Sequence, residues 1–430
     1  MKICVYGMWH LGSVTSASLA KLGHTVVGLD FNKEIIKNLQ NAEAPVSEPG
    51  LNELIYENIQ RKTLSFTSEP RIALAQIDVL WIGFDTPVDE EDNADVNSIE
   101  IYFEKISKLI PDKTKIIISS QVPVGFTRRL QNRFQEKYPV KEVFFVYSPE
   151  NLRLGKALKT FLEPDRIIIG INPNEKEKFL PVFTSISDRL EWMNIESAEM
   201  TKHAINAFLA TSICFANEVA SLCEHAGANA KEVERGLKTE ERIGPKAYLN
   251  PGNAFSGGTL ARDVRFLQEM GKKNILPLYL INSILASNDY HKTWIQRKCK
   301  EILGDLNGKH ITVLGLTYKP GTNTLRRSMS VELCKWIKNQ GAEVTAFDPA
   351  IHELPPELLV VMSLASDLSG SVKTAECIII ATEWPDFRKI ETDIITTMRG
   401  KIIIDPNGFM ENILGDVRNL EYFAVGRSYQ

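Results

Sequence analysis

Two polar residues, Lys202 and Asn206, stand four positions apart in a segment whose apolar residues recur at helical spacing. On a helix, residues i and i+4 project from one face, a turn apart. A partly buried lysine can act as a general base, and an asparagine amide can orient a hydroxyl group or an oxyanion. The alternative to a catalytic role, for an isolated pair of this kind, is a solvated lysine beside an asparagine on the helix surface. Because an apolar helix face flanks the pair here, we interpret it as a candidate catalytic site.

A second pattern, the turn Gly7-Met8-Trp9-His10-Leu11-Gly12, is typical of dinucleotide binding. In a Rossmann GxGxxG turn, backbone N–H groups at a helix start hold a pyrophosphate. Asp30 follows Gly12 by 30 − 12 = 18 residues, near the usual spacing for an acid on the ribose 2′-hydroxyl, so NAD is favoured over NADP. Trp9 replaces the central glycine of this motif. The alternative to a dinucleotide site is therefore a β-turn-α unit that binds no ligand. The strand–turn–helix–strand context favours a dinucleotide, with expected contacts from Gly7, Trp9, His10, Leu11, Gly12 and Asp30.

The elements that position these residues predict an α/β fold. Short β-rich runs alternate with amphipathic helices in the first part of the chain, which indicates a parallel sheet covered on both faces. Helical periodicity follows from about Ser197 to Gly227 and from about Ala261 to Leu303, and strand–helix alternation then returns. We expect two doubly wound, Rossmann-like domains, 1–187 and 304–430, joined by an all-helical dimerisation segment, 188–303. The expected strands are Lys2–Tyr6, Thr25–Leu29, Val79–Ile82, Lys115–Ser119, Val143–Tyr147, Arg166–Ile169, Lys309–Gly315, Glu343–Phe347, Cys377–Ala381 and Lys401–Ile404.

Composition restricts the class of protein. The 430 residues are 43% hydrophobic and 24% charged, as in soluble globular chains of more than one domain. A net charge of −4 argues against a nucleic-acid or anionic-membrane partner, and Lys, Asp or Asn interrupts every apolar run before transmembrane length. The opening residues read as a strand rather than a signal peptide. The six cysteines are scattered without a CxxC pair, so we expect buried thiols in a reducing cytoplasm and neither disulfides nor a metal site.

Further motifs follow one another along the chain: APVSEPGL (44–51), DTP (85–87) with DNAD (92–95), SQVPVGFT (120–127), SPENLRLG (148–155), KHAINAF (202–208), PGNAFSGGTLARD (251–263) and KPGT (319–322). In order and spacing they resemble the PIxEPGL, GTP…DGxAD, STVPVGT, NPEFLREG, KxxxNAF, GFGGSC-FPKD and KPxT motifs of the UDP-glucose/GDP-mannose dehydrogenase family. The resemblance extends from Lys2 to about Gly408.

This resemblance implies an NAD-dependent enzyme of polysaccharide biosynthesis, most like UDP-glucose 6-dehydrogenase, that oxidises the primary alcohol of a UDP-sugar toward the uronic acid. It implies a homodimer in which an arginine reaches the partner's active site. The implied catalytic residues are Lys202, Asn206, Asp263, Thr259 and Glu150. The implied further cofactor contacts are Thr86, Gln121 and Arg326, and the implied substrate contacts are Leu152, Arg153, Arg242, Tyr248, Phe255, Gly257 and Lys319.

Thr259 stands where the family carries a nucleophilic cysteine. In the family this thiol adds to the aldehyde made by the first oxidation, and the adduct is oxidised to a thioester that water hydrolyses. A threonine hydroxyl is a poor nucleophile without a strong adjacent base. Three outcomes remain open: Thr259 orients an aldehyde hydrate that Asp263 and Lys202 deprotonate, the chain releases an aldehyde or ketone after one oxidation, or it only binds a nucleotide-sugar. At 405–407, Asp-Pro-Asn also replaces DGRN, which removes one expected substrate arginine.

Overall fold

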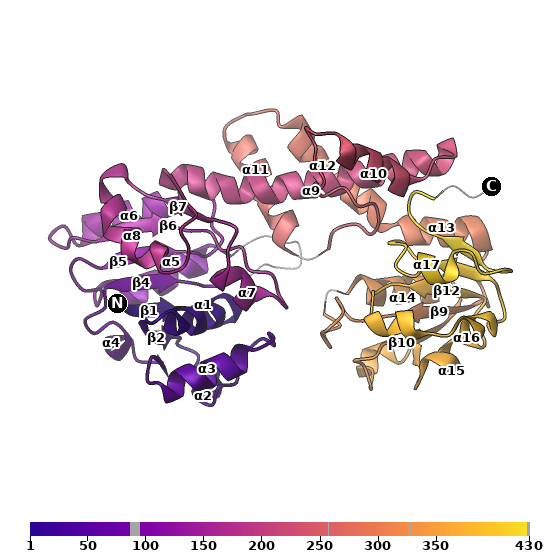
Figure 1. Cartoon of the computed structure of the whole chain (residues 1–430), viewed down its shortest axis with the longest axis horizontal. Coiled ribbons are helices and arrows are strands. Elements are labelled where there is room, and N and C mark those ends of the chain that lie inside the picture. Colours follow the sequence, from indigo (N-terminus) through magenta and orange to yellow (C-terminus); the bar gives the residue numbers. More distant parts are fainter. Residues whose placement is uncertain (87–94, 257, 327, 428–430) are drawn as a thin grey trace. The chain divides into compact units, whose positions relative to one another are not determined.

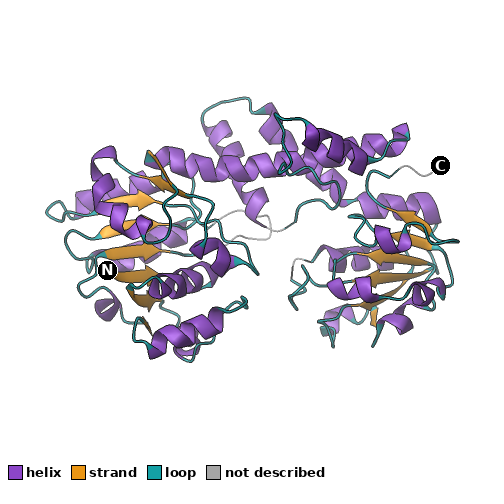
Figure 2. Cartoon of the chain, in the orientation of Figure 1, coloured by secondary structure: helices purple, strands orange, loops and turns teal. Residues whose placement is uncertain are grey.

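The computed structural model describes residues 1–86, 95–256, 258–326 and 328–427. Contacts divide the chain into two compact units, Met1–Ile205 and Asn206–Gln430, which we name unit 1 and unit 2. Each unit contains one β-sheet flanked by helices, and the elements are labelled along the chain in Figure 1 and coloured by type in Figure 2.

In the described part of unit 1, eight strands form a single sheet in the order β3-β2-β1-β4-β5-β6-β7-β8. Successive strands leave β1 in one direction and β4 in the other, so the loops after β1 and β4 meet at a topological switch point, where α/β sheets bind ligands. β7 runs antiparallel to β6, and the other neighbouring pairs are parallel. The bounds are β1 Lys2–Tyr6, β2 Thr25–Leu29, β3 Leu64–Thr67, β4 Val79–Ile82, β5 Lys115–Ile118, β6 Phe144–Tyr147, β7 Ile167–Gly170 and β8 Leu190–Met193.

The side chains of β1 show why both faces of this sheet are covered. Ile3 and Val5 enter one hydrophobic cluster, whereas Cys4 and Tyr6 enter the cluster on the opposite face. A strand buried on both faces reads as a continuous apolar run, which is how β1 was recognisable in the sequence. The helices of unit 1 are α1 His10–Lys21, α2 Lys33–Gln40, α3 Leu51–Gln60, α4 Pro70–Ala73, α5 Asn97–Ser107, α6 Phe126–Lys137, α7 Ala157–Leu162, η1 Pro173–Glu175 and α8 Lys176–Thr184.

Unit 2 ends in a parallel sheet of six described strands in the order β11-β10-β9-β12-β13-β14. Its switch point lies between β9 and β12. The strands are β9 His310–Leu314, β10 Glu343–Phe347, β11 Ser363–Leu364, β12 Cys377–Ile380, β13 Ile402–Ile404 and β14 Glu421–Phe423. The helices that precede and cover it are α10 Ala230–Thr239, α11 Gly258–Lys273, α12 Tyr279–Lys292, α13 Trp294–Leu303, α14 Met329–Asn339, η2 Pro356–Leu358, α15 Leu368–Val372, η3 Pro385–Lys389, α16 Thr392–Thr396 and α17 Glu411–Leu414.

The longest helix, α9 (Ile195–Ala226), begins in unit 1 and continues into unit 2. Within unit 2, its small residues Ala207 and Ala210 and the thiol-bearing Cys214 pack in one cluster with Val264 of α11 and Ile284 of α12. By length and composition α9 could cross a membrane, which the sequence analysis did not expect. The core helix of a soluble protein meets the same criteria, and 44% of the apolar window of α9 is buried within the chain.

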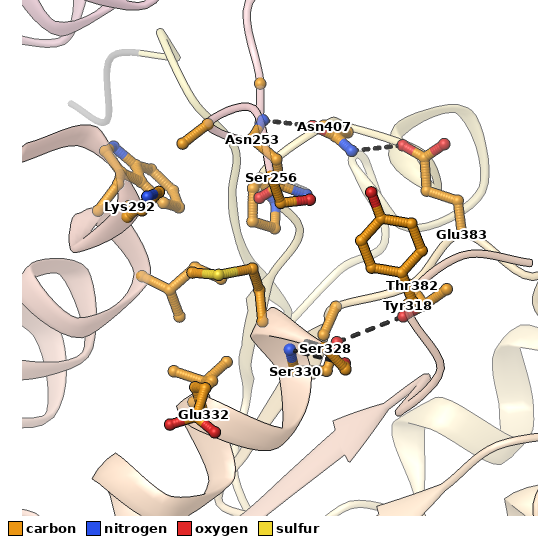
Figure 3. A pocket seen from close by; sticks show the side chains of 18 of the residues that line it. Asn253, Ser256, Lys292, Tyr318, Ser328, Ser330, Glu332, Thr382, Glu383 and Asn407 are labelled. Carbon is orange, nitrogen blue, oxygen red and sulfur yellow. Dashed lines mark hydrogen bonds between the residues drawn. The ribbon is translucent and has the colours of Figure 1, made fainter. Parts of the chain in front are cut away.

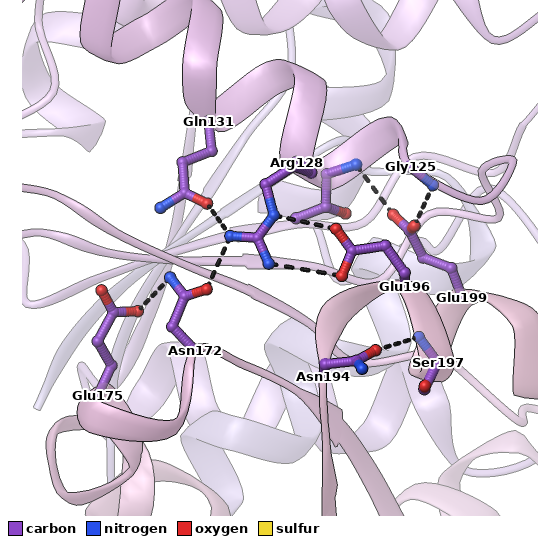
Figure 4. Close-up of polar contacts among 10 residues, drawn as sticks. Gly125, Arg128, Gln131, Asn172, Glu175, Asn194, Glu196, Ser197 and Glu199 are labelled. Atoms are coloured by element: carbon purple, nitrogen blue, oxygen red, sulfur yellow. Dashed lines mark hydrogen bonds and ion pairs between the residues drawn. The ribbon is translucent and has the colours of Figure 1, made fainter.

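Charged side chains fix the first turns of α9 within unit 1 (Figure 4). Arg128 of α6 donates to Glu196 over 3.0 Å. One turn later, the fully buried Glu199 accepts hydrogen bonds from the N–H groups of Gly125 (2.5 Å) and Thr127 (2.9 Å). The first N–H groups of a helix have no partner inside the helix, so a carboxylate at this place stabilises α6. The first turn of α6 has no acidic residue of its own.

The predicted fold class is confirmed, and the expected strands are found to within a residue at each end. Four described strands were missed: β3, β8, β11 and β14. β8 lies inside the segment 188–303 that was expected to be all helical, so helix begins only with α9. This strand could not be recognised as an apolar run, because its four residues, Leu190-Glu191-Trp192-Met193, include a charge and are only partly buried. The antiparallel β7 also corrects the expectation of a wholly parallel sheet.

Candidate active site

The turn after β1 has the backbone geometry of a dinucleotide-binding loop. Gly7 has a φ of +97°, a region that favours glycine. A Cβ added to Gly12 would lie 1.6 Å from the carbonyl oxygen of Gly7, so only glycine allows α1 to approach the strand this closely. Trp9 stands at the N-cap of α1 and is 49% exposed, so its side chain leaves this packing undisturbed. The fold therefore accepts tryptophan at the position of the central glycine.

Carboxylates surround this turn. Asp30, at the end of β2, accepts the Met8 N–H over 2.8 Å and the Asn32 N–H over 2.9 Å. His10 lies 3.2 Å from the buried Glu48, which also accepts the N–H groups of Gly155 and Ala157. Leu11 donates its N–H to Asp85 over 3.0 Å. The sequence analysis singled out neither Glu48 nor Asp85 as a site residue, although both lie in motifs that it recognised.

Within unit 1, Lys202 and Glu150 are brought together. Lys202 is 6% exposed, and its Nζ donates to the Glu150 carbonyl oxygen over 2.5 Å and lies 3.5 Å from Oε1 of the same residue. The other carboxylate oxygen of Glu150 accepts the Leu152 N–H over 2.7 Å. The ammonium group is therefore held by one residue of the loop after β6. Arg153, three residues after Glu150, is exposed.

Two more expected cofactor residues meet at the edge of the same sheet. Thr86, after β4, donates its hydroxyl to the Gln121 carbonyl oxygen over 2.7 Å, and both residues are buried. His203 contacts the next carbonyl, that of Val122, over 2.9 Å. A carbonyl only accepts, so Nε2 of His203 carries the proton. The loop after β5 is thus attached both to the loop after β4 and to α9.

Within unit 2, Asn206 of α9 donates a hydrogen bond to the carboxylate of Asp263, which is fully buried on α11. Thr259 lies exposed in the first turn of α11, four residues before Asp263 and therefore on the same helix face. Asn206 and Asp263 therefore form a buried polar pair, and Thr259 lies one turn away from it on α11. Gly257, an expected substrate contact, lies outside the described residues.

Side chains from α9 and α12 hold the backbone of the loop that leads to α11. Asn217 accepts the Gly252 N–H over 2.9 Å, and His291 donates to the Gly252 carbonyl over 2.7 Å. Burial lowers the pKa of His291, which favours the neutral imidazole, and the neutral ring makes this contact with its proton on Nε2. Asn288 bonds both the N–H and the carbonyl of Phe255 over 2.9 Å. The sequence analysis missed these positioning residues, because amide and imidazole side chains on helices give no periodic signal.

A pocket in unit 2 opens where the chain leaves β9, β12 and β13, at the switch point of the second sheet (Figure 3). It is lined by the N-terminus of α14, where Ser328 caps the helix by accepting the Ser330 N–H. Lys319 lines the pocket, as does Asn407, which accepts the Asn253 N–H and donates to Glu383, each over 2.6 Å. Asn407 therefore ties the wall of the pocket to the loop before α11.

Three other expected site residues lie exposed in unit 2: Tyr248, Arg326 and Arg242. The Arg242 guanidinium pairs with Glu240 over 2.7 Å, and its side chain is 88% exposed. None of the three lines the described pocket around Lys319.

The chain matches three domain descriptions in order: the NAD binding domain of the UDP-glucose/GDP-mannose dehydrogenase family at 1–186, its central domain at 196–290 and its UDP binding domain at 312–412. The chain belongs to this family. It is 32% identical over 437 residues to UDP-glucose 6-dehydrogenase from Rhizobium meliloti (strain 1021), covering 99% of this chain and 100% of that protein.

Solved structures of the family are similar over the whole chain. A UDP-glucose dehydrogenase from Pyrobaculum islandicum has a TM-score of 0.88 at 29% identity, covering 99% of this chain and 98% of the other. A UDP-D-ManNAc dehydrogenase from Pyrococcus horikoshii has a TM-score of 0.85 at 25% identity, covering 99% of both chains. This family member is therefore an NAD-dependent oxidoreductase that acts on a CH–OH group of a nucleotide-sugar.

No cysteine of this dehydrogenase is placed to replace the missing nucleophile. All six lie among the described residues and are free and buried. Burial raises the pKa of every one of these thiols, to about 12 for Cys299 and Cys334. Cys214, which shares a cluster with Phe255, contacts the Ile284 carbonyl over 3.4 Å. Because the thiolate is the nucleophilic form, none of these groups is activated.

We therefore predict that iodoacetamide leaves the activity intact. Treatment at pH 8 should alkylate no cysteine of the folded protein, since the thiols are buried and protonated. Mass spectrometry after the treatment should show full labelling only in denaturant. Inactivation that tracks the alkylation of one cysteine, and that substrate prevents, would show that a reactive thiol exists.

Proposed function

We propose that this dehydrogenase oxidises the primary alcohol of a UDP-hexose, with UDP-glucose the first substrate to test, to the uronic acid in two hydride transfers without a thioester. The choice of sugar is supported by the full-length likeness to the Rhizobium meliloti UDP-glucose 6-dehydrogenase. The observation that carries the chemistry is the pairing of a retained, buried Lys202 with the absence of any exposed thiol. Free thiols also support a reducing compartment, the cytoplasm.

In the first oxidation, Lys202 is the proposed general base. Its neutral amine takes the proton of the C6 hydroxyl while the hydride on C6 passes to NAD, which leaves an aldehyde, NADH and a protonated lysine. Asn206 orients the oxygen that is losing its proton. The carbonyl of Glu150, 2.5 Å from Nζ, keeps the amine aligned in either protonation state, because neutral and charged lysine both donate.

In the second oxidation, water adds to the aldehyde to give a hydrate, and the hydrate loses a second hydride to NAD and a proton to a base. This gives the carboxylic acid and a second NADH with all atoms balanced. Asp263, already bonded to Asn206, is the proposed base or orienting group, and the hydroxyl of Thr259 is the proposed contact to a hydrate oxygen. No covalent bond to the protein is needed.

The cofactor and the nucleotide have separate proposed sites. Gly7, Gly12 and the start of α1 suit the NAD pyrophosphate, and Asp30 suits the adenosine ribose. In unit 2, the pocket at the start of α14 suits the UDP diphosphate, since a helix N-terminus and a lysine both favour anions. Lys319, which lines this pocket, is the lysine that we propose for this contact.

Replacing Lys202 with Ala should lower kcat/KM for UDP-glucose by about 10²- to 10⁴-fold, the usual contribution of a general base. Thermal-shift titration should show that the variant still binds NAD and UDP. Lys272→Ala, at an exposed lysine of α11, is the control and should match the wild type. A Lys202→Ala variant that retains most of the activity would mean that another group removes the proton.

We also propose a homodimer formed through α9. In unit 2, Phe208, Phe215 and Leu222 recur at seven-residue spacing on this helix and are 71%, 50% and 69% exposed. Large apolar side chains aligned on one helix are typical of a face that a partner covers. The exposed Arg242 is free to reach the active site of a second copy, as the resemblance implies.

Phe215→Asp should therefore convert the protein to a monomer at micromolar concentration in analytical ultracentrifugation, because it places a charge in the apolar contact. Val140→Asp, at a 94% exposed position of unit 1, should leave the dimer unchanged. A wild-type protein that sediments as a fully active monomer would exclude this assembly.

A further inference from the structure

The carboxylate of Asp85 occupies a backbone donor at the start of α1. Its Oδ2 accepts the Leu11 N–H over 3.0 Å. Among the described residues, no other carboxylate is recorded as accepting a backbone N–H from the first turn of α1: the N-cap Trp9 makes no side-chain cap, the first turn contains no acidic residue, and Glu48 contacts only the His10 side chain there. Unpaired N–H groups and the positive end of the helix dipole attract anions to this place. Asp85, from the loop after β4, thus takes the role of an N-terminal cap for α1.

The backbone around Asp85 is anchored on both sides. The preceding residue, Phe84, has its ring 4.7 Å from Tyr6 and 4.9 Å from Tyr102. The following residue, Thr86, donates its hydroxyl to the Gln121 carbonyl over 2.7 Å. Asp85 itself is exposed. The backbone on either side of Asp85 is therefore held in place, while its side chain lies at the surface beside the start of α1.

We infer that Asp85 competes with the NAD pyrophosphate for the start of α1 and thereby sets the affinity for the cofactor. This inference rests on the proposal that the pyrophosphate lies at this helix start. A phosphate oxygen that binds the Leu11 N–H must displace the carboxylate, and the displaced negative charge stays beside a second negative group. The family motif that this segment resembles has glycine at this position, which offers no such competitor.

The same contact predicts opposite effects on the free protein and on the complex. Without cofactor, Asp85 satisfies an N–H that would otherwise have only water, so it stabilises unit 1. With the cofactor bound, the negative charge of Asp85 repels the pyrophosphate. Asp85→Gly should therefore lower the melting temperature of the free protein and at the same time tighten NAD binding. A residue that merely supports the fold would not tighten binding when it is removed.

The test is isothermal titration of NAD into the wild type, Asp85→Gly and Asp85→Asn. We expect the Kd for NAD to fall by about 3- to 10-fold in Asp85→Gly, the size of a charge effect at a helix start. Asp85→Asn should lie between the two, because the amide keeps an acceptor but loses the charge. Asp188→Asn, which removes an exposed charge elsewhere in unit 1, should leave the Kd unchanged. Adenosine, as a competitor without phosphate, should bind all variants equally.

Asp30→Ala separates the inference from the site on which it rests. If Asp85→Gly leaves NAD affinity unchanged or weaker while Asp30→Ala weakens it, the site is right and competition by Asp85 is wrong. If neither substitution changes the Kd, the cofactor does not lie at this turn, and both ideas are overturned. Tighter binding of adenosine to Asp85→Gly would also contradict competition with the pyrophosphate.

Discussion

The catalytic proposal for unit 1 depends on the hydrogen bonds between the buried carboxylate of Glu199 and the start of α6. This carboxylate accepts the first N–H groups of α6, and burial raises its pKa, so the site is stable only while these donors satisfy it. One turn further along α9, His203 holds the loop after β5 through the Val122 carbonyl. Lys202 stands between these two anchors in the sequence, so its ammonium group is delivered to the Glu150 carbonyl and not to solvent. A flexible side chain is thereby held in one place, as the proposed role of Lys202 as a base requires.

Asp85, Thr259 and Asn407 are among the positions that depart from the family pattern, whereas the expected catalytic residues Lys202, Asn206 and Asp263 match it. Each described replacement has a place in the structure: Asp85 caps α1, and Asn407 ties the loop before α11 to Glu383. Thr259 keeps a hydroxyl in the first turn of α11, on the face of Asp263. The chemistry that we propose for this site is therefore proton transfer and hydride transfer, without a protein nucleophile.

Much of the fold was predictable because buried parallel strands are apolar runs between helices of clear period, as β1, β2 and β12 are. β8 and β14 were not, because both are short edge strands that carry a charge: β8 is only partly buried, and β14 has just three residues. Of the site, Lys202, Glu150, Asn206 and Asp263 were each named from motifs. Their contacts, Lys202 with Glu150 and Asn206 with Asp263, came from the structure. The supporting residues Glu199, Asn288 and His291 could not be found from the sequence. Their hydrogen bonds go to backbone groups tens of residues away, and such groups leave no side-chain pattern.

The amount of NADH formed per UDP-glucose consumed, measured with excess NAD and with the product identified by mass spectrometry, tests the central claim most directly. We expect two NADH per sugar, UDP-glucuronic acid as the product, and no added mass on protein that is quenched during turnover, because the site has no thiol to acylate. One NADH per sugar with an accumulating aldehyde or ketone would contradict two oxidations. No NADH from any UDP- or GDP-sugar, while a sugar nucleotide still raises the melting temperature, would contradict catalysis altogether.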